Sequence, residues 1–278
     1  MPSILEISNV SRSFGGLKAL DDLNLTLEKG VIEGLIGPNG AGKTTLFNVI
    51  TGVYPPDQGS IQFMDKEIAG KKPHEIVALG IARTFQNIRL FPNMTVVENV
   101  LVGCHSRMRA GVWGALSRNR HTVEEEERTL GNAQKLLGFV GLKARSDDLA
   151  RNLPYGDQRR LEMARALGAD PILLLLDEPT AGMNPQETNT LTDFIRRIRD
   201  ELGLTVLLIE HDMRVVMGIS DRVTVLDQGA WIGSGTPREV QKNTRVIEAY
   251  LGKGAIQLHK RRADLLSQGN RGHGSPRG

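Results

Sequence analysis

The sequence predicts an α/β fold in which a buried parallel sheet carries an antiparallel β region at its start and a helical insertion in its middle. Three observations support this. Short apolar runs at 31–36, 172–176, 206–209 and 223–226 are typical of buried parallel strands. Apolar residues between the later runs recur at helical intervals, and the early residues alternate between apolar and polar. The composition, 40% hydrophobic and 24% charged, is that of an ordinary globular domain.

The elements follow in a consistent order. Leu23, Leu25 and Leu27 alternate with polar residues before a Glu28-Lys29-Gly30 turn, which predicts mostly antiparallel strands in this first part of the chain. From 92 to 169 helical patterns replace strand runs, which indicates a helical insertion. Residues 185–202 place apolar side chains at helical intervals opposite charged ones, which predicts an amphipathic helix crossing between two parallel strands.

Charge and cysteine content exclude several classes of protein. The 35 Lys and Arg exceed the 32 Asp and Glu by three and are spread along the chain, which argues against nucleic acid as a partner. Cys104 is the single cysteine, so the chain has no internal disulfide and no Cys-x-x-Cys site, and a reducing compartment is expected. The amino terminus lacks a signal-peptide pattern, and no apolar run has membrane-spanning length.

A phosphate-binding loop follows the first buried strand. Its glycines let the backbone fold around phosphates, and the start of the next helix adds favourable partial charge. Lys43 would reach the β- and γ-phosphates, and the Thr44 hydroxyl would bind magnesium. The loop residues predicted to bind nucleotide are Gly37, Pro38, Asn39, Gly40, Ala41, Gly42, Lys43, Thr44 and Thr45.

Two acids end another buried strand. Asp177 and Glu178 follow the apolar run 172–176, at the edge where the carboxyl ends of parallel strands meet. Asp177 is expected to hold magnesium through water, and Glu178 to polarise the attacking water. Alone, the pair would also suit a strand end before a turn at Pro179. Together with the phosphate loop, it predicts nucleotide hydrolysis.

The stretch 153–167 resembles the signature loop and helix of the ABC ATPase family. Its sequence is Leu-Pro-Tyr-Gly-Asp-Gln-Arg-Arg-Leu-Glu-Met-Ala-Arg-Ala-Leu. The family pattern is Leu-Ser-Gly-Gly-Gln, followed by a helix with Arg and Ala residues. The resemblance covers residues 4–252 and implies a P-loop NTPase (RecA-like) core at 1–90 and 170–252 with an antiparallel β subdomain. It implies a helical subdomain at about 91–169, followed by a basic, flexible tail at 253–278.

The resemblance implies roles for three further residues. Phe14 stands where an aromatic ring stacks on adenine, although a core aromatic at a strand end would look the same. Gln86, in Arg-Thr-Phe-Gln-Asn, looks like the glutamine that touches magnesium and the attacking water. His211, after a buried strand, looks like the switch histidine that contacts the γ-phosphate.

In this family two cassettes close head to tail, so that the signature loop of one caps the ATP of the other. Tyr155, Gly156 and Asp157 would make that contact here. Three positions depart from the family pattern, because Pro154, Asp157 and Asn184 replace a serine, a glutamine and an aspartate. A weakened or asymmetric second site follows as a hypothesis.

Segments 34–48, 80–96, 155–162 and 209–213 resemble the ATP-binding subunit of branched-chain amino acid importers. This implies ATP and Mg²⁺ as cofactors, a second cassette (identical or paralogous), two membrane-spanning permease subunits and, indirectly, a periplasmic or lipid-anchored substrate-binding protein. It implies a peripheral position on the cytoplasmic face of the inner membrane. The apolar residues within 87–99 would then face the permease or, alternatively, pack inside the insertion: Ile88, Leu90, Phe91 and Met94.

Other functions remain open. The nearest alternative is the ATPase subunit of a related transporter for urea, short amides or lipid-linked material. A soluble ABC protein of DNA repair or translation would usually carry two cassettes or a long coiled coil, and this chain has neither. A nucleotide-binding regulator without turnover would not need Glu178 and His211.

Overall fold

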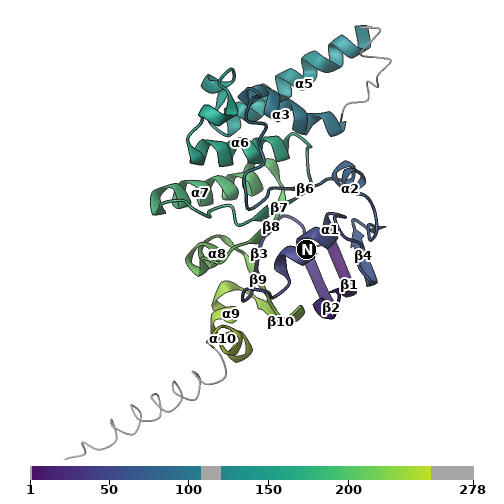
Figure 1. Cartoon of the computed structure of the whole chain (residues 1–278). Helices are drawn as coiled ribbons and strands as arrows, with labels where there is room; N and C mark the ends of the chain where they lie inside the picture. Colours follow the sequence, from purple (N-terminus) through teal and green to yellow (C-terminus); the bar gives the residue numbers. More distant parts are fainter. Residues whose placement is uncertain (1, 108–119, 252–278) are drawn as a thin grey trace, which may run out of the picture.

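The computed structural model describes residues 2–107 and 120–251, so the tail predicted at 253–278 lies outside the described residues. Within them the chain forms two sheets and a group of helices that lies beyond one face of the larger sheet (Figure 1). No helix in these ranges has the length and apolar character needed to cross a membrane.

The larger sheet has six strands in the order β10-β9-β3-β8-β7-β6, and only β10 runs antiparallel to its neighbour. Every residue of β3, β7 and β8 is buried, because these strands are covered on both faces. The strands are β3 (Ile32–Ile36), β6 (Ile81–Arg83), β7 (Leu173–Asp177), β8 (Thr205–Ile209), β9 (Arg222–Asp227) and β10 (Ala230–Gly235). The predicted parallel runs are therefore confirmed.

The smaller sheet is antiparallel, as predicted, with the order β2-β1-β4-β5. Its apolar side chains join a core cluster that includes Phe47 and Leu35, so this sheet packs beside the first helix and the centre of the larger sheet. The strands are β1 (Ser3–Phe14), β2 (Leu17–Glu28), β4 (Gln58–Phe63) and β5 (Lys66–Glu67).

Strand β7 contributes side chains to two hydrophobic cores, one on each face of the larger sheet. Leu173 and Leu175 belong to the cluster with the antiparallel sheet, whereas Leu174 and Leu176 belong to a second cluster with the helices of the insertion and α7. Successive side chains of a strand point to opposite faces, so an unbroken apolar run is what this position requires. The same strand then ends at Asp177, at the edge of the sheet.

The helices occupy the intervals that the periodicity predicts. Between β6 and β7 the regular structure of the described chain is helical, apart from one isolated β-bridge, in agreement with the predicted insertion. Helix α7 covers the predicted residues, begins at an Asn184 cap and ends at Gly203. The helices of more than one turn are α1 (Lys43–Ile50), α2 (Pro73–Leu79), α3 (Val96–Cys104), α5 (Arg120–Phe139), α6 (Tyr155–Leu167), α7 (Pro185–Leu202), α8 (Met213–Ile219), α9 (Pro237–Lys242) and α10 (Thr244–Leu251). Short 3₁₀ turns join them at η1 (His105–Arg107), η2 (Lys143–Arg145) and η3 (Ala150–Asn152).

Helices α3 and α6 meet through their backbones. A Cβ atom at Gly103 would lie 1.9 Å from the carbonyl oxygen of Arg165, so no side chain fits between the two helices there. This contact holds the helix that follows the glutamine segment against the helix that follows the signature loop.

Candidate nucleotide site

The phosphate loop joins the central strand β3 to α1, at the side of the larger sheet where the parallel strands have their carboxyl ends. Its last glycine, Gly42, has a left-handed φ of 98°, and a Cβ there would lie 2.4 Å from the carbonyl oxygen of Ala19. Only glycine fits this position. Helix α1 therefore starts at Lys43 with its N-terminus at the loop, an arrangement that attracts phosphate.

A cleft of about 840 Å³ opens over the loop. It brings together residues from the antiparallel sheet, the phosphate loop and the end of β7. The predicted site residues among its lining are Phe14, Asn39, Gly40, Ala41, Gly42, Lys43, Thr44, Thr45 and Glu178. The cleft is also lined by residues that no motif marks: Leu17, Lys18, Ala19 and Gln228. The volume suits a small-molecule ligand.

Lys43 folds back onto its own loop. Its Nζ atom donates hydrogen bonds to the carbonyl oxygens of Gly37, at 2.7 Å, and Pro38, at 3.0 Å. Burial lowers the pKa of the Lys43 ammonium, and the negative charges of Glu178 and Asp177 oppose that shift. Lys43, the residue predicted to bind phosphate, thus lies close to Asp177, which ends β7, and to Glu178, which follows it.

The other two predicted catalytic residues, Gln86 and His211, both lie next to Glu178. Gln86, after β6, donates a hydrogen bond from Nε2 to Glu178 Oε2 at 2.7 Å. His211, after β8, places Nδ1 3.5 Å from the same oxygen. Glu178 itself has a left-handed φ of 47°. The loops after β6 and β8 therefore each bring one side chain to the carboxylate that follows β7, the strand between them.

Phe14 lies at the end of β1 and is 40% exposed, so it is not the core aromatic that its position could also have suggested. Its ring packs edge-on against Tyr54, with centroids 5.3 Å apart. The guanidinium of Arg12 lies 5.0 Å from the centre of the Phe14 ring. An aromatic face held at the rim of the cleft is available to a planar base.

The signature residues lie away from this cleft. Gly156 and Asp157 line a separate hollow of about 240 Å³ between α6 and α7. Tyr155 donates its hydroxyl hydrogen to the carbonyl oxygen of Ala181 at 2.9 Å. The carboxylate of Asp157 forms ion pairs with Arg145, at 3.0 Å, and with Arg160. Within one chain, therefore, the signature residues do not line the cleft over the phosphate loop.

Comparisons with known proteins give the family of the chain. A family model described as "ABC transporter" matches residues 20–181, more than half of the chain. This chain belongs to the ABC transporter family. A second model, described as "Branched-chain amino acid ATP-binding cassette transporter", matches residues 232–256. The chain is thus an ATP-hydrolysing cassette.

Two curated relatives cover nearly the whole cassette. The high-affinity branched-chain amino acid transport ATP-binding protein LivG of Escherichia coli strain K12 is 44% identical over 250 residues, 90% of this chain and 98% of the relative. The corresponding protein BraF of Pseudomonas aeruginosa is 45% identical over 250 residues, with the same coverage.

Solved structures give the same result. The ADP conformation of MJ1267, an ATP-binding cassette of an ABC transporter, has a TM-score of 0.79 and 34% identity, and covers 91% of this chain and 100% of its own. The cassette cbiO1 of Clostridium perfringens, part of the transporter complex cbiONQ, has a TM-score of 0.73 and 27% identity over 94% of this chain and 100% of its own.

The cassette also explains one departure from the family pattern. Asn184 caps α7, because its side-chain oxygen accepts hydrogen bonds from the backbone N–H groups of Gln186 and Glu187, both at 2.9 Å. Asparagine and aspartate are about equally good helix caps. Replacing aspartate by asparagine therefore preserves the local structure of the loop before α7.

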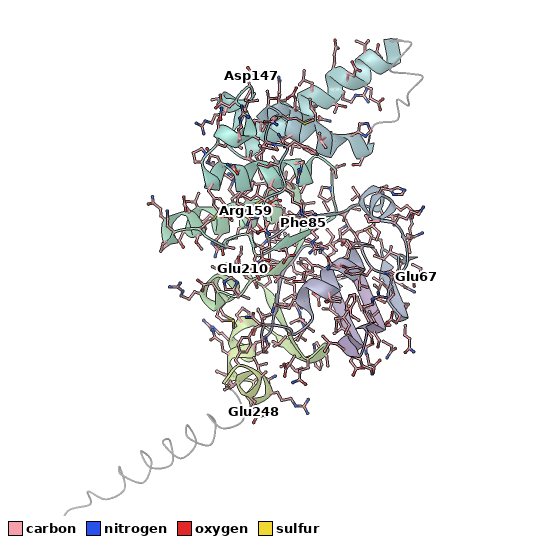
Figure 2. The ribbon with its side chains drawn as sticks, in the orientation of Figure 1. Glu67, Phe85, Asp147, Arg159, Glu210 and Glu248 are labelled. Carbon is pink, nitrogen blue, oxygen red and sulfur yellow. The ribbon has the colours of Figure 1, made fainter. Side chains whose placement is uncertain are left out.

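Two buried arginines of the cassette lie inside the quoted motifs, but the sequence assigned no role to either of them. Arg83 pairs with Asp177 at 2.6 Å. Arg159 on α6 is 1% exposed and donates to the carbonyl oxygens of Phe85, at 2.7 Å, and of Gln86. Figure 2 labels Arg159 and Phe85, which lie where the helical part meets the larger sheet. From sequence alone, a charged residue within a strand or helix is expected to be exposed, so sequence patterns do not predict that Arg83 and Arg159 are buried.

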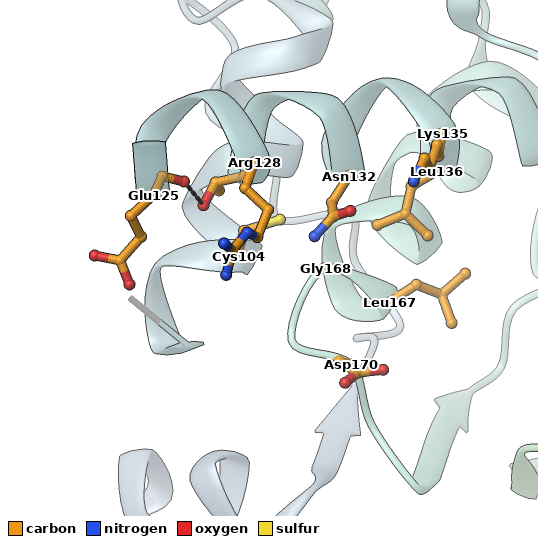
Figure 3. A pocket seen from close by; sticks show the side chains of 10 residues that line it. Cys104, Glu125, Arg128, Asn132, Lys135, Leu136, Leu167, Gly168 and Asp170 are labelled. Atoms are coloured by element: carbon orange, nitrogen blue, oxygen red, sulfur yellow. Dashed lines mark hydrogen bonds between the residues drawn. The ribbon is translucent and has the colours of Figure 1, made fainter. Parts of the chain in front are cut away.

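A hollow of about 540 Å³ lies in the helical part and holds no predicted site residue (Figure 3). Arg128, Asn132 and Lys135 line it from α5, and Cys104 lies at the end of α3. Burial raises the pKa of the Cys104 thiol, which keeps it protonated at neutral pH. Cys104 is therefore a packed side chain of the helical part.

Proposed function

We propose that this chain is the ATP-hydrolysing subunit of an importer for the branched-chain amino acids leucine, isoleucine and valine. The substrate class is supported by the LivG and BraF relatives and by the family model over residues 232–256. Hydrolysis is supported above all by one observation, the convergence of Gln86 and His211 on Glu178 beside the phosphate loop.

In the proposed site Phe14 stacks on adenine, and the backbone N–H groups of the phosphate loop bind the phosphates. Glu178 polarises the attacking water, and His211 contacts the γ-phosphate. Because the amide nitrogen of Gln86 faces Glu178, its carbonyl oxygen is left for other ligands. The charge that develops on the phosphates would be balanced by Lys43 and by the N-terminus of α1.

The chemistry of the three predicted metal donors fits magnesium. The Thr44 hydroxyl, the Gln86 carbonyl oxygen and the Asp177 carboxylate are all hard oxygen donors, which Mg²⁺ prefers. These residues would hold the metal, Asp177 through water. When bound, Mg²⁺ would neutralise charge on the β- and γ-phosphates.

A second cassette completes the site in this proposal. The signature residues Tyr155, Gly156 and Asp157 lie outside the cleft of their own chain, so they would reach ATP only in a partner. Asp157 is already paired with Arg145 and Arg160, so the backbone of the α6 N-terminus, at Gly156, is the part that can meet a γ-phosphate. Whether the partner is identical or a paralogue does not change this geometry.

The permease subunits would dock on the helical part. An apolar groove of about 590 Å³ lies between α3 and α5, lined among others by Met94, Leu101 and Val102. Of the residues predicted to face the permease, Phe91 and Met94 are exposed. Leu90 instead packs partly against the core of the insertion. The proposed position of the subunit is peripheral, on the cytoplasmic face of the inner membrane.

Two substitutions test the docking groove. Met94→Asp and Val102→Asp replace side chains that are 38% and 40% exposed, so they should leave ATP binding intact and separate hydrolysis from transport. Leu202→Asp is the control, because Leu202 is 42% exposed at the far end of α7. Transport at the normal rate in both groove variants would contradict the groove assignment.

The decisive experiment measures ATPase activity and uptake in membrane vesicles that carry the chain with its co-encoded subunits. Wild type is compared with Glu178→Gln. We expect ATP-dependent leucine uptake that the variant abolishes, while the variant still binds ATP. ATP turnover in wild type without amino acid uptake would keep the hydrolase and move the substrate to urea, short amides or lipid-linked material.

A further inference from the structure

Arg83 connects three parts of the nucleotide site through one side chain. Its Nη2 atom donates to Asp177 Oδ2 at 2.6 Å, at the end of β7. Its Nη1 atom donates to Asn48 Oδ1 at 2.7 Å, on the helix that follows the phosphate loop. Arg83 itself ends β6, three residues before Gln86. The phosphate-loop helix, the acid strand and the glutamine segment therefore share one guanidinium.

The pairing is enclosed. The side chains of Arg83 and Asp177 are each 6% exposed. The rings of Phe47 and Phe85 lie against the guanidinium, with centroids 5.3 Å and 5.0 Å away. A planar fork held by rings and by two oxygen acceptors has one orientation, which lysine could not reproduce. Because the pair is buried, loss of the arginine would leave the Asp177 charge uncompensated.

The register of the sheet explains how Arg83 reaches the acid. β6 runs parallel to β7 with Arg83 opposite Leu175, two residues before Asp177. The arginine side chain thus extends along its neighbour toward the edge of the sheet. It occupies Oδ2 of Asp177, and among the described residues no hydrogen bond to Oδ1 is formed. One oxygen is fixed by protein and the other remains for a ligand.

We propose that Arg83 is a positioning residue for the metal: by fixing Oδ2 of Asp177 it leaves Oδ1 free to hold, through water, the magnesium that Thr44 would also hold. This inference rests on the proposed function, because it takes Asp177 to be the magnesium carboxylate. It assigns to Arg83 the coupling of metal position to both the phosphate-loop helix and the glutamine segment. Arg83 does not touch ATP in this proposal.

The test measures binding of a fluorescent ATP analogue to the purified full-length chain, first in EDTA and then across a Mg²⁺ titration. Arg83→Gln should raise the Mg²⁺ concentration for half-maximal binding about tenfold or more, the usual effect of losing a residue that orients a metal ligand, and should change affinity in EDTA by less. Arg83→Lys, which keeps charge without the fork, should show an intermediate shift. Mn²⁺ in place of Mg²⁺ gives a second readout by electron paramagnetic resonance, without turnover.

Two further variants make the result specific. Asn48→Ala removes one anchor of Arg83 but leaves the Asp177 pair, and should shift the Mg²⁺ dependence in the same direction by less. Should Arg83→Gln fail to fold, Asn48→Ala and Arg83→Lys still decide the question. Arg199→Lys is the matched control, because Arg199 also bridges two side chains, Asp200 and Asp221, and belongs to no motif of the nucleotide site.

Three outcomes would overturn the inference. The first is an unchanged Mg²⁺ dependence of binding in the Arg83 variants. The second is a lower Mg²⁺ concentration for half-maximal binding, which would make Arg83 a competitor of the metal, and the third is an equal loss of affinity in EDTA, which would make its role structural only. If wild type itself fails to bind the analogue, the proposed function fails first. The two failures are therefore distinguishable.

Discussion

Gln86 and Glu178 are joined by a hydrogen bond of 2.7 Å between Nε2 and Oε2. A carboxylate only accepts hydrogen bonds, so the amide nitrogen must face it. Gln86 belongs to the segment that leads into the helical part, and Glu178 to the end of a core strand. The hydrogen bond thus joins the segment that leads into the helical part to the carboxylate that would polarise water.

His211→Ala should reduce hydrolysis without harming the fold. The His211 side chain is 65% exposed, so the free energy of unfolding should change by about 0.5 kcal/mol or less. Loss of a group that contacts the γ-phosphate should lower the hydrolysis rate by about 10²-fold. Phosphate release and thermal unfolding, measured on the same preparation, check both parts. Hydrolysis at the wild-type rate would remove His211 from the mechanism.

Pro154→Ser should raise the ATPase rate. Pro154 precedes α6 with extended backbone and offers no side-chain cap, whereas serine would cap the helix and add a hydroxyl and an N–H group at the signature loop. The cap alone should stabilise the chain by about 0.5 to 1 kcal/mol. ATPase assays with the partner cassette present and urea unfolding curves measure the two effects. No increase in rate would count against a weakened second site.

Arg159→Leu should destabilise the cassette strongly. Arg159 pairs with Glu162 at 3.1 Å, and the side chains are 2% and 1% exposed. Burial raises the pKa of Glu162, and the neighbouring guanidinium opposes that shift. Removing one partner of such a pair costs about 3 to 5 kcal/mol. Urea unfolding gives the value.

Arg160→Leu is the control for that measurement. The Arg160 side chain is 33% exposed and pairs with Asp157 at the surface, so its loss should cost about 1 kcal/mol or less. Similar losses in both variants would mean that burial of the Arg159 pair does not determine its contribution.

Glu33→Gln should change how stability depends on pH. Glu33 is 1% exposed in β3, and burial raises its pKa above the ordinary 4.5, although the hydroxyl of Thr224 donates to it at 2.6 Å. Because the folded state holds the proton more tightly, the contribution of Glu33 is fully present below pH 4.5 and is lost as pH rises through the raised value.

The glutamine variant should therefore gain stability relative to wild type as pH is raised from 4.5 toward neutrality. Glutamine keeps an acceptor for Thr224, so the hydroxyl stays paired. Urea unfolding of both proteins between pH 4 and 8 measures the difference. A difference that is the same at every pH would show that Glu33 does not titrate in this range.

The sequence predicted those parts of the fold that have a strong local pattern. β3, β7, β8 and β9 are apolar runs, and their predicted ends differ from the structure by about a residue, the usual precision of such boundaries. β6 was missed because three residues, Ile81–Arg83, are too few to form a pattern. Strand order and the antiparallel β10 depend on long-range pairing, which periodicity does not encode.

The same distinction holds for the site. The phosphate loop, Asp177 and Glu178 could be predicted because their spacing is local and their chemistry demands it. Arg83 and Arg159 could not, because a buried arginine is defined by partners far along the chain, such as Asp177 and the carbonyl of Phe85. The roles assigned to individual site residues stay predictions, to be checked by the variants above.

The contact at Gly103 has a mechanical consequence. Side chains between helices can change rotamer and absorb a displacement, but here backbone meets backbone, and a Cβ would lie 1.9 Å from the Arg165 carbonyl oxygen. Helix α3, beside the apolar groove, and helix α6, which begins at the signature loop, therefore have no compliant layer between them at this point. A displacement of α3 at the groove would therefore move α6, and with it the signature loop, because no side chain between the two helices can repack at this contact.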